Sequence, residues 1–161
     1  MVWHHLSEEK ITEIYDIDCK VAASSKKLKP RGLWLSYNNE WEEWNDTGEP
    51  GVFIVGNYKY KYKVTLKKNL NVLKIETVEE LYDFNKKYGK KDKVIKKMIR
   101  INWEKVCEDY DGIFFMNYRK ILDDESVEYN DEFIWYNMLD VSSACIFRPS
   151  LVVSKIIEEP L

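Results

Sequence analysis

The chain has 161 residues, which is the length of one globular domain and leaves little room for a second. Hydrophobic residues make up 45% of it and charged residues 33%, enough to fill one core and to solvate its surface. No apolar run approaches the roughly 20 residues that cross a bilayer, so we expect no membrane partner. Cys19, Cys107 and Cys145 are odd in number and far apart, so we expect reduced core thiols, no metal site and a cytoplasmic location.

The formal charge of −3 hides an asymmetry along the chain. Residues 56–105 contain fifteen Lys or Arg and only six Asp or Glu, while the remainder is acidic. Such segregation is typical of a surface for nucleic acid or another polyanion. Fourteen of the fifteen cations are Lys, which also keep a helix or an edge strand soluble, and the pattern alone favours this plainer interpretation.

The first predicted element is a short strand over residues 2–7, in which His5 and Ser7 share a face. Ser7 then caps a helix that we expect to run to about Cys19, because acidic residues fill its first turn and apolar residues follow at helical spacing.

Residues 20–30 are rich in Lys and Ser and predict a loop. The next strand is expected over residues 31–37, and Trp41 and Trp44, at helical spacing, indicate a short helix. Residues 46–51 have the composition of a turn.

The clearest strand covers residues 57–66, where tyrosines alternate with lysines. Its aromatic face is typical of a half-buried antiparallel strand, and also of a platform on which bases stack. A strand over 72–75 follows, and a capping box from Thr77 to Glu80 begins a helix that ends at Gly89.

A second helical region is predicted from about Lys93 to Tyr110, with a break near Asn102. Buried strands are then expected at residues 113–115, 133–136 and 144–157, the last of them broken at Pro149. Strands outnumber helices and the tightest strands look antiparallel. The fold class is therefore α+β, with one core.

Three separated strand-like segments each carry a chemically capable residue: Trp3 to Ser7, Arg31 to Ser36, and Tyr129 to Tyr136. In this order and at roughly these separations they resemble the histidine, aromatic and glutamate strands of the ADP-ribosyltransferase superfamily, especially its poly(ADP-ribose) polymerase-like branch. The resemblance implies one domain over residues 1–161, built on a mainly antiparallel split sheet flanked by short helices. It also implies that NAD is a substrate.

The first motif of that family is a histidine followed two residues later by Ser or Thr, which hold the two riboses of NAD, and His5 and Ser7 match it. The segment from Gly32 to Ser36 looks like the strand that walls the nicotinamide pocket. Its Trp34 stands where the family usually has Tyr. An indole can stack on a pyridinium ring.

Ser36 or Tyr37 can supply the hydroxyl group that Trp34 lacks. Lys29 and Arg31 flank Pro30 just before this strand. They are suited to neutralising the pyrophosphate of NAD, and are equally typical of solvated loop cations.

The third segment is similar to the strand that carries the catalytic glutamate, and Glu132 takes that position. A carboxylate near the ribose stabilises the oxocarbenium-like state in which the nicotinamide bond breaks, and it can orient an incoming nucleophile. His5 then fixes the ribose from the other side. Two alternative acids are Asp140 and Asp111, the second in an Asp-Gly motif that is also an ordinary turn.

The predicted function is therefore transfer of ADP-ribose from NAD to a protein or nucleic-acid acceptor, with release of nicotinamide. An NAD-dependent RNA 2′-phosphotransferase or an NAD glycohydrolase on the same fold is the alternative enzyme. A third interpretation is a non-enzymatic module that binds nucleic acid or protein through the basic Tyr/Lys strand.

Overall fold

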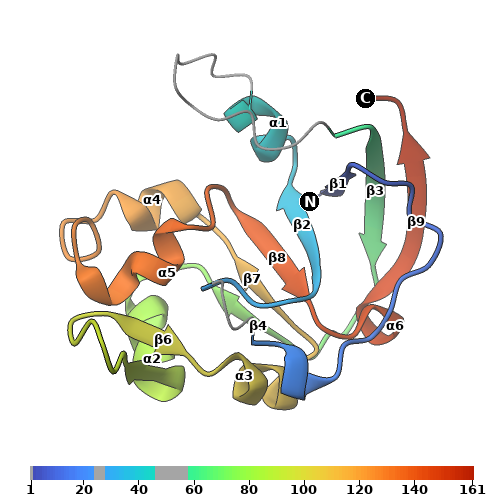
Figure 1. Cartoon of the computed structure of the whole chain (residues 1–161). Helices are drawn as coiled ribbons and strands as arrows, with labels where there is room; N and C mark the ends of the chain where they lie inside the picture. Colours follow the sequence, from blue (N-terminus) through green and yellow to red (C-terminus); the bar gives the residue numbers. More distant parts are fainter. Residues whose placement is uncertain (1, 24–27, 46–57) are drawn as a thin grey trace.

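The structure is a computed structural model that describes residues 2–23, 28–45 and 58–161 (Figure 1). The turn predicted over 46–51 and the first residue of the predicted strand 57–66 lie outside the described residues. The described chain is built on one sheet of seven strands in the order β4-β7-β8-β2-β1-β3-β9. Only β4 and β7 are parallel, and every other neighbouring pair is antiparallel. The predicted α+β class and the mainly antiparallel sheet are confirmed.

The sheet contains β1 (Trp3–Ser7), β2 (Leu33–Tyr37), β3 (Tyr60–Leu66), β4 (Val72–Ile75), β7 (Gly112–Phe115), β8 (Ser143–Ile146) and β9 (Val153–Glu159). A separate hairpin is formed by β5 (Gly89–Lys91) and β6 (Ile99–Ile101). The helices are α1 (Glu40–Asn45), α2 (Val78–Tyr88), α3 (Trp103–Asp109), α4 (Tyr118–Leu122), α5 (Ile134–Asn137) and α6 (Pro149–Val152). Two 3₁₀ turns, η1 (Cys19–Val21) and η2 (Asp131–Phe133), complete the described elements.

Local sequence signals account for several of these elements. In α2 the Thr77 hydroxyl accepts the Glu80 N–H and the Glu80 carboxylate accepts the Thr77 N–H, so the predicted capping box is confirmed. In β3, Tyr62 and Val64 are buried while Lys63 is exposed, as the alternating pattern predicts.

The sheet separates two hydrophobic cores because successive strand residues face opposite sides. Phe115 belongs to the larger core, together with Phe84 of α2 and Trp135 of α5. Phe114 belongs to the smaller core, with Trp3 of β1.

The strands β1 and β2 pair at one end only and then separate, and this gap positions the candidate site. β1 pairs with β3 at all five of its residues, but with β2 only through Trp3 with Tyr37 and His4 with Ser36. On its other edge, β2 pairs with β8 along its length from Leu33 to Ser36. The two strands therefore diverge beyond His4, as Figure 1 shows.

The helix predicted from Ser7 to Cys19 is wrong, since residues 8–18 form no helix. The Ser7 hydroxyl accepts the Glu9 N–H two residues on, which makes a local turn instead of a helix cap. Beyond it the Ile11 N–H donates to the Tyr62 hydroxyl and the Ile17 N–H to the Phe147 carbonyl. These contacts with the sheet satisfy backbone groups that a helix would have paired internally.

The helical region predicted from Lys93 is wrong in its first half and right in its second. Ile99 and Ile101 are buried on either side of the exposed Arg100, a period of two that places them in β6. The expected break at Asn102 is confirmed, because its side chain accepts the Lys105 N–H and caps α3.

The strand predicted over 133–136 is also wrong, so Glu132 does not begin a strand. The Asn130 side chain accepts the Glu132 N–H and starts η2, which continues into α5. Asn85 of α2 fixes this helical turn, because its amide donates to the Glu132 carbonyl and accepts the Trp135 indole N–H. Phe133 and Trp135 are both buried in the larger core.

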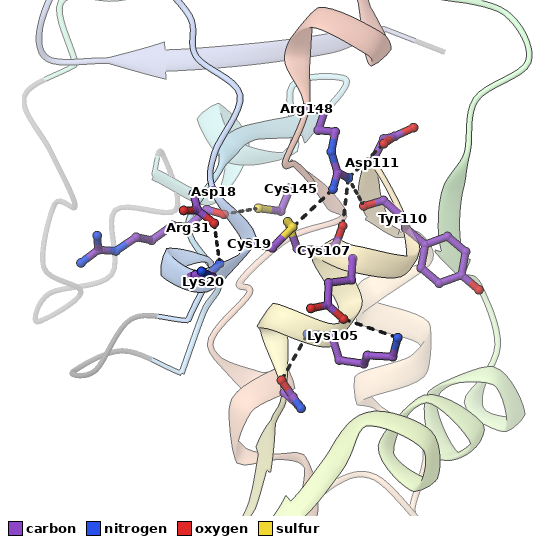
Figure 2. Close-up of a disulfide and its surroundings, with 12 residues drawn as sticks. Asp18, Cys19, Lys20, Arg31, Lys105, Cys107, Tyr110, Asp111, Cys145 and Arg148 are labelled. Carbon is purple, nitrogen blue, oxygen red and sulfur yellow. Dashed lines mark hydrogen bonds and ion pairs between the residues drawn. A yellow bond between two sulfur atoms is a disulfide. The ribbon is translucent and has the colours of Figure 1, made fainter.

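The expectation of three reduced cysteines is corrected by a disulfide between Cys19 and Cys107, which joins η1 to α3 (Figure 2). Residues 88 apart in sequence are thereby linked. Cys145 is a free thiol in β8, and burial raises its pKa. It alone matches the predicted reduced core thiol.

Candidate active site

A cavity of about 540 Å³ opens where β1 and β2 diverge. Its volume falls in the range of small-molecule and cofactor sites. Five of the residues that the sequence pattern assigns to NAD line it: His5, Arg31, Gly32, Trp34 and Ser36. Lys29 also lines it, so both cations that flank Pro30 border the same space.

His5 presents a hydrogen-bond acceptor in this cavity. Its Nδ1 lies 2.7 Å from the Trp34 carbonyl oxygen, across the gap between the two strands. A carbonyl only accepts, so Nδ1 carries the proton and Nε2 of the neutral ring is left as an acceptor. Burial lowers the pKa of His5, with the Trp34 hydrogen bond opposing that effect, and the neutral ring is favoured.

Trp34 is held in place by a hydrogen bond from its indole N–H and by stacking on an aromatic ring. Its indole N–H donates to the Pro30 carbonyl at 3.1 Å, and its ring stacks on Phe115 with 6.3 Å between centroids. The Lys29 ammonium lies 5.8 Å from the Trp34 ring centroid, a cation–π contact. A planar ligand can reach this half-buried ring only by competing with that ammonium group.

Asp140 is the predicted acid that adjoins the cavity. Its Oδ2 lies 3.4 Å from Lys29 Nζ, and its neighbours Leu139 and Val141 both line the space. Its backbone has a φ of 70°, in the left-handed region that Asp tolerates better than most side chains. The Ser142 N–H donates to the Glu40 carboxylate of α1, which ties this loop to α1.

Ser143 adds a polar group that the protein does not satisfy. It lines the cavity with only 4% of its surface exposed, and its hydroxyl has no hydrogen-bond partner among the described residues. Buried hydroxyls are usually paired, because desolvation without a partner is costly. A polar ligand in the cavity would complete its bonding.

Gly32 is required by the close approach of β2 to β8. A Cβ at this position would lie 2.6 Å from Cys145 Sγ and 2.7 Å from the Ile146 carbonyl oxygen. The glycine therefore lets the wall of the cavity lie directly on its neighbour strand.

Five predicted residues are not among those that line the cavity: Ser7, Tyr37, Glu132, Asp111 and Asp140, the last of which adjoins it. The Ser7 hydroxyl bonds to Glu9, and Tyr37 packs edge-on against Trp3 in the smaller core. Glu132 lies in η2 against α2, and no described contact places its carboxylate at the cavity.

Asp111 has a structural role that the sequence does not reveal. Its Oδ1 accepts from Arg148 Nη1 at 3.0 Å, and the same nitrogen donates to the Cys107 and Tyr110 carbonyls (Figure 2). Arg148 Nη2 reaches Cys19 Sγ. One arginine therefore ties the start of β7 to the disulfide.

Sequence reasoning missed several lining residues, among them His4, Trp41, Tyr58 and Ser143. The helical spacing of Trp41 and Trp44 is a sequence signal for α1, and Trp41 of this helix lines the cavity. Ser143 had no comparable signal, because only the pairing of β8 with β2 places it there.

No protein-family model, curated protein or solved structure matches this chain. Within the described residues, no group of three or more His, Cys, Asp or Glu is arranged to hold a metal ion. No helix of the described residues has both the length and the apolar character needed to cross a membrane.

Proposed function

We propose that the protein is an NAD-dependent ADP-ribosyltransferase whose reaction takes place in the cavity between β1 and β2. The observation that carries the proposal is that His5 of β1, Trp34 of β2 and Gly32 just before β2 all line one cavity of ligand size. The sequence resemblance implies that the same three residues hold NAD.

Each group of the site has a role suited to NAD. The Nε2 acceptor of His5 takes a hydrogen bond from a ribose hydroxyl, and Trp34 provides a flat surface for nicotinamide. Lys29 and Arg31 border the cavity with positive charge, which favours the pyrophosphate. Breaking the bond between nicotinamide and ribose transfers ADP-ribose to the acceptor, releases nicotinamide and leaves the acceptor's proton to a base.

Asp140 is our choice for the acidic residue. Its carboxylate is within an ion-pair distance of Lys29, which itself lies beside the Trp34 ring. A carboxylate there stabilises positive charge developing on the ribose and can accept the acceptor's proton. Glu132, which the sequence pattern favours, lies in a helical turn against Asn85.

The test compares wild type with Asp140→Asn and Glu132→Gln. Each protein is incubated with NAD labelled on the adenine, and free nicotinamide is followed together with label on protein, RNA and DNA. Both substitutions replace a half-buried carboxylate by its amide, so each is the other's matched control. We expect Asp140→Asn to slow nicotinamide release by about 100-fold and Glu132→Gln to change it by less than about threefold.

The remaining outcomes are equally definite. If only Glu132→Gln loses nicotinamide release, the acidic residue is Glu132, which the sequence pattern favours. Release without label on any acceptor would make the enzyme an NAD glycohydrolase. A wild-type protein that neither binds nor cleaves NAD would refute the proposal and leave a binding module.

A further inference from the structure

The β5–β6 hairpin ends in a well-defined turn, which we call the hairpin tip (residues 92–98). The Asp92 carboxylate accepts the Val94 N–H at 2.8 Å and the Ile95 N–H at 2.9 Å, and it also pairs with Arg100. The Asp92 N–H donates to the Met98 carbonyl, which closes the turn. The tip is thus an ordered structure.

This turn displays two aliphatic side chains to solvent. Val94 is 88% exposed and Ile95 is 54% exposed. Val94 is the most exposed large aliphatic side chain in the described parts of the chain. Neighbouring Met98 and Ile99 are buried and supply the packing that supports the hairpin, so the two tip side chains contribute little to folding.

A dense set of cations surrounds these two residues. Between residues 86 and 100 the chain has eight basic residues and one acidic residue. The basic residues are Lys86, Lys87, Lys90, Lys91, Lys93, Lys96, Lys97 and Arg100. The single acid of this stretch, Asp92, is paired with Arg100, so the stretch carries a large net positive charge.

The structure also divides the basic middle of the sequence into two parts. The lysines of β3 lie in the sheet beside β1 and β9, and Lys61 forms an ion pair with Glu42 at 2.6 Å. The hairpin lies at the other end of the molecule, beside α2 (Figure 1). The hairpin cations therefore form a surface of their own.

We propose that the hairpin tip docks the protein onto the surface of an anionic lipid bilayer. Val94 and Ile95 at the apex would enter the boundary between headgroups and acyl chains, while the flanking lysines contact the anionic headgroups. The positive charge and the exposed apolar apex together fit a partner that is anionic at its surface and apolar just below it.

Other polyanions complement the positive charge of this surface but not its apolar side chains. Nucleic acid can pair with the charges of the lysines, but it offers no apolar layer for two exposed aliphatic side chains. The hairpin tip also has no aromatic side chain that could stack on bases. The expectation of no membrane partner rests on the absence of a spanning segment, and docking at a surface needs none. The proposal is independent of NAD chemistry in the cavity.

The test is sedimentation of the full chain with vesicles of phosphatidylcholine alone and with vesicles containing about one third phosphatidylserine. A fluorescently labelled oligonucleotide of RNA and one of DNA provide the competing polyanions. The variant Val94→Ser/Ile95→Ser removes the apolar apex and keeps every charge. Its matched control, Leu151→Ser/Ile157→Ser, removes two exposed aliphatic side chains elsewhere on the surface.

We expect anionic vesicles to bind at least about tenfold more tightly than neutral ones, and raised salt to weaken that binding. The tip variant should lose about tenfold in affinity for anionic vesicles, and its control should not. Equal binding by the tip variant, or equal binding to both vesicle types, would overturn the proposal. Binding to RNA or DNA without binding to vesicles would overturn it as well and assign the surface to nucleic acid.

Discussion

At the scale of single residues, the protonation state of His5 links the site to pH. Its Nδ1 proton is committed to the Trp34 carbonyl, so a second proton can only go to Nε2. That proton would convert the acceptor facing the ligand into a donor and would place a positive charge in a site for cationic nicotinamide. Burial lowers the pKa of His5 below its ordinary 6.5, so this change occurs in acid.

The predicted consequence is a loss of NAD affinity in acid. Affinity should be constant above pH 6.5 and, below the lowered pKa of His5, fall by at most about tenfold per pH unit. Between pH 6.5 and the lowered pKa of His5, the folded state also binds fewer protons than the unfolded state. The contribution of His5 to stability is therefore complete above 6.5 and declines as the pH falls through the lowered pKa. Calorimetric titration of NAD between pH 8 and 5 measures the binding.

His5→Gln is the control for this titration. The amide of Gln can donate and accept a hydrogen bond but does not titrate. We expect weaker binding whose affinity does not change across the same pH range. An equal acid loss in His5→Gln would assign the titration to another group.

The residue scale also shows where the sequence pattern could and could not identify the site. His5 and Trp34 are identifiable because each belongs to a short strand whose spacing fixes its face, and Gly32 directly precedes the second of these strands. Sequence spacing does not decide whether Asp140 or Glu132 is the acid of the site. Both lie in irregular or helical turns, and only the packing of β8 against β2 brings the Asp140 loop to the cavity.

At the scale of elements, the disulfide anchors the segment that carries the cavity cations. Cys19 is joined to Cys107 of α3, and the Trp103 indole N–H of the same helix donates to the Leu28 carbonyl. The Arg31 N–H donates to the Ala22 carbonyl three residues after Cys19. Leu28 and Arg31 flank Lys29, so their two hydrogen bonds fix the short segment that carries both cations.

We therefore predict that breaking the disulfide lowers both stability and NAD affinity. Linking residues 88 apart restricts the unfolded chain, and the expected loss in the free energy of unfolding is about 2–4 kcal/mol. Urea unfolding with and without dithiothreitol measures it, and NAD binding is followed in the same two conditions. Cys19→Ser/Cys107→Ser should match the reduced wild type and should not respond to dithiothreitol. A wild type that is equally stable in both conditions would contradict the prediction.

Elements were predictable where one local signal dominates. The capping box of α2 and the Tyr/Lys alternation of β3 each specify their element without help from the rest of the chain. The segment over 133–136 was mistaken for a strand because a short apolar run suits either a buried strand or a buried helical turn. Contacts with Asn85 of α2, 50 residues from Trp135 in sequence, decide for the helical turn.

At the scale of the whole molecule, the cavity and the hairpin tip lie at different ends of the fold. The cavity lies between β1 and β2, beside α1, and the hairpin projects beside α2 and α3 (Figure 1). A transferase needs only its cavity to cleave NAD, whereas docking would determine which acceptors come within reach. The two proposals therefore predict separable effects.

The last prediction is that changes at the two sites are additive. Val94→Ser/Ile95→Ser should leave NAD cleavage in solution within about twofold of wild type, and Asp140→Asn should leave vesicle binding unchanged. In a double-mutant cycle on NAD affinity, we expect a coupling energy below about 0.5 kcal/mol, the limit for distant sites without shared partners. A coupling well above that value, measured without vesicles, would show that the hairpin reaches the cavity through the fold. Coupling that appears only with anionic vesicles would instead mean that docking itself changes access to the site.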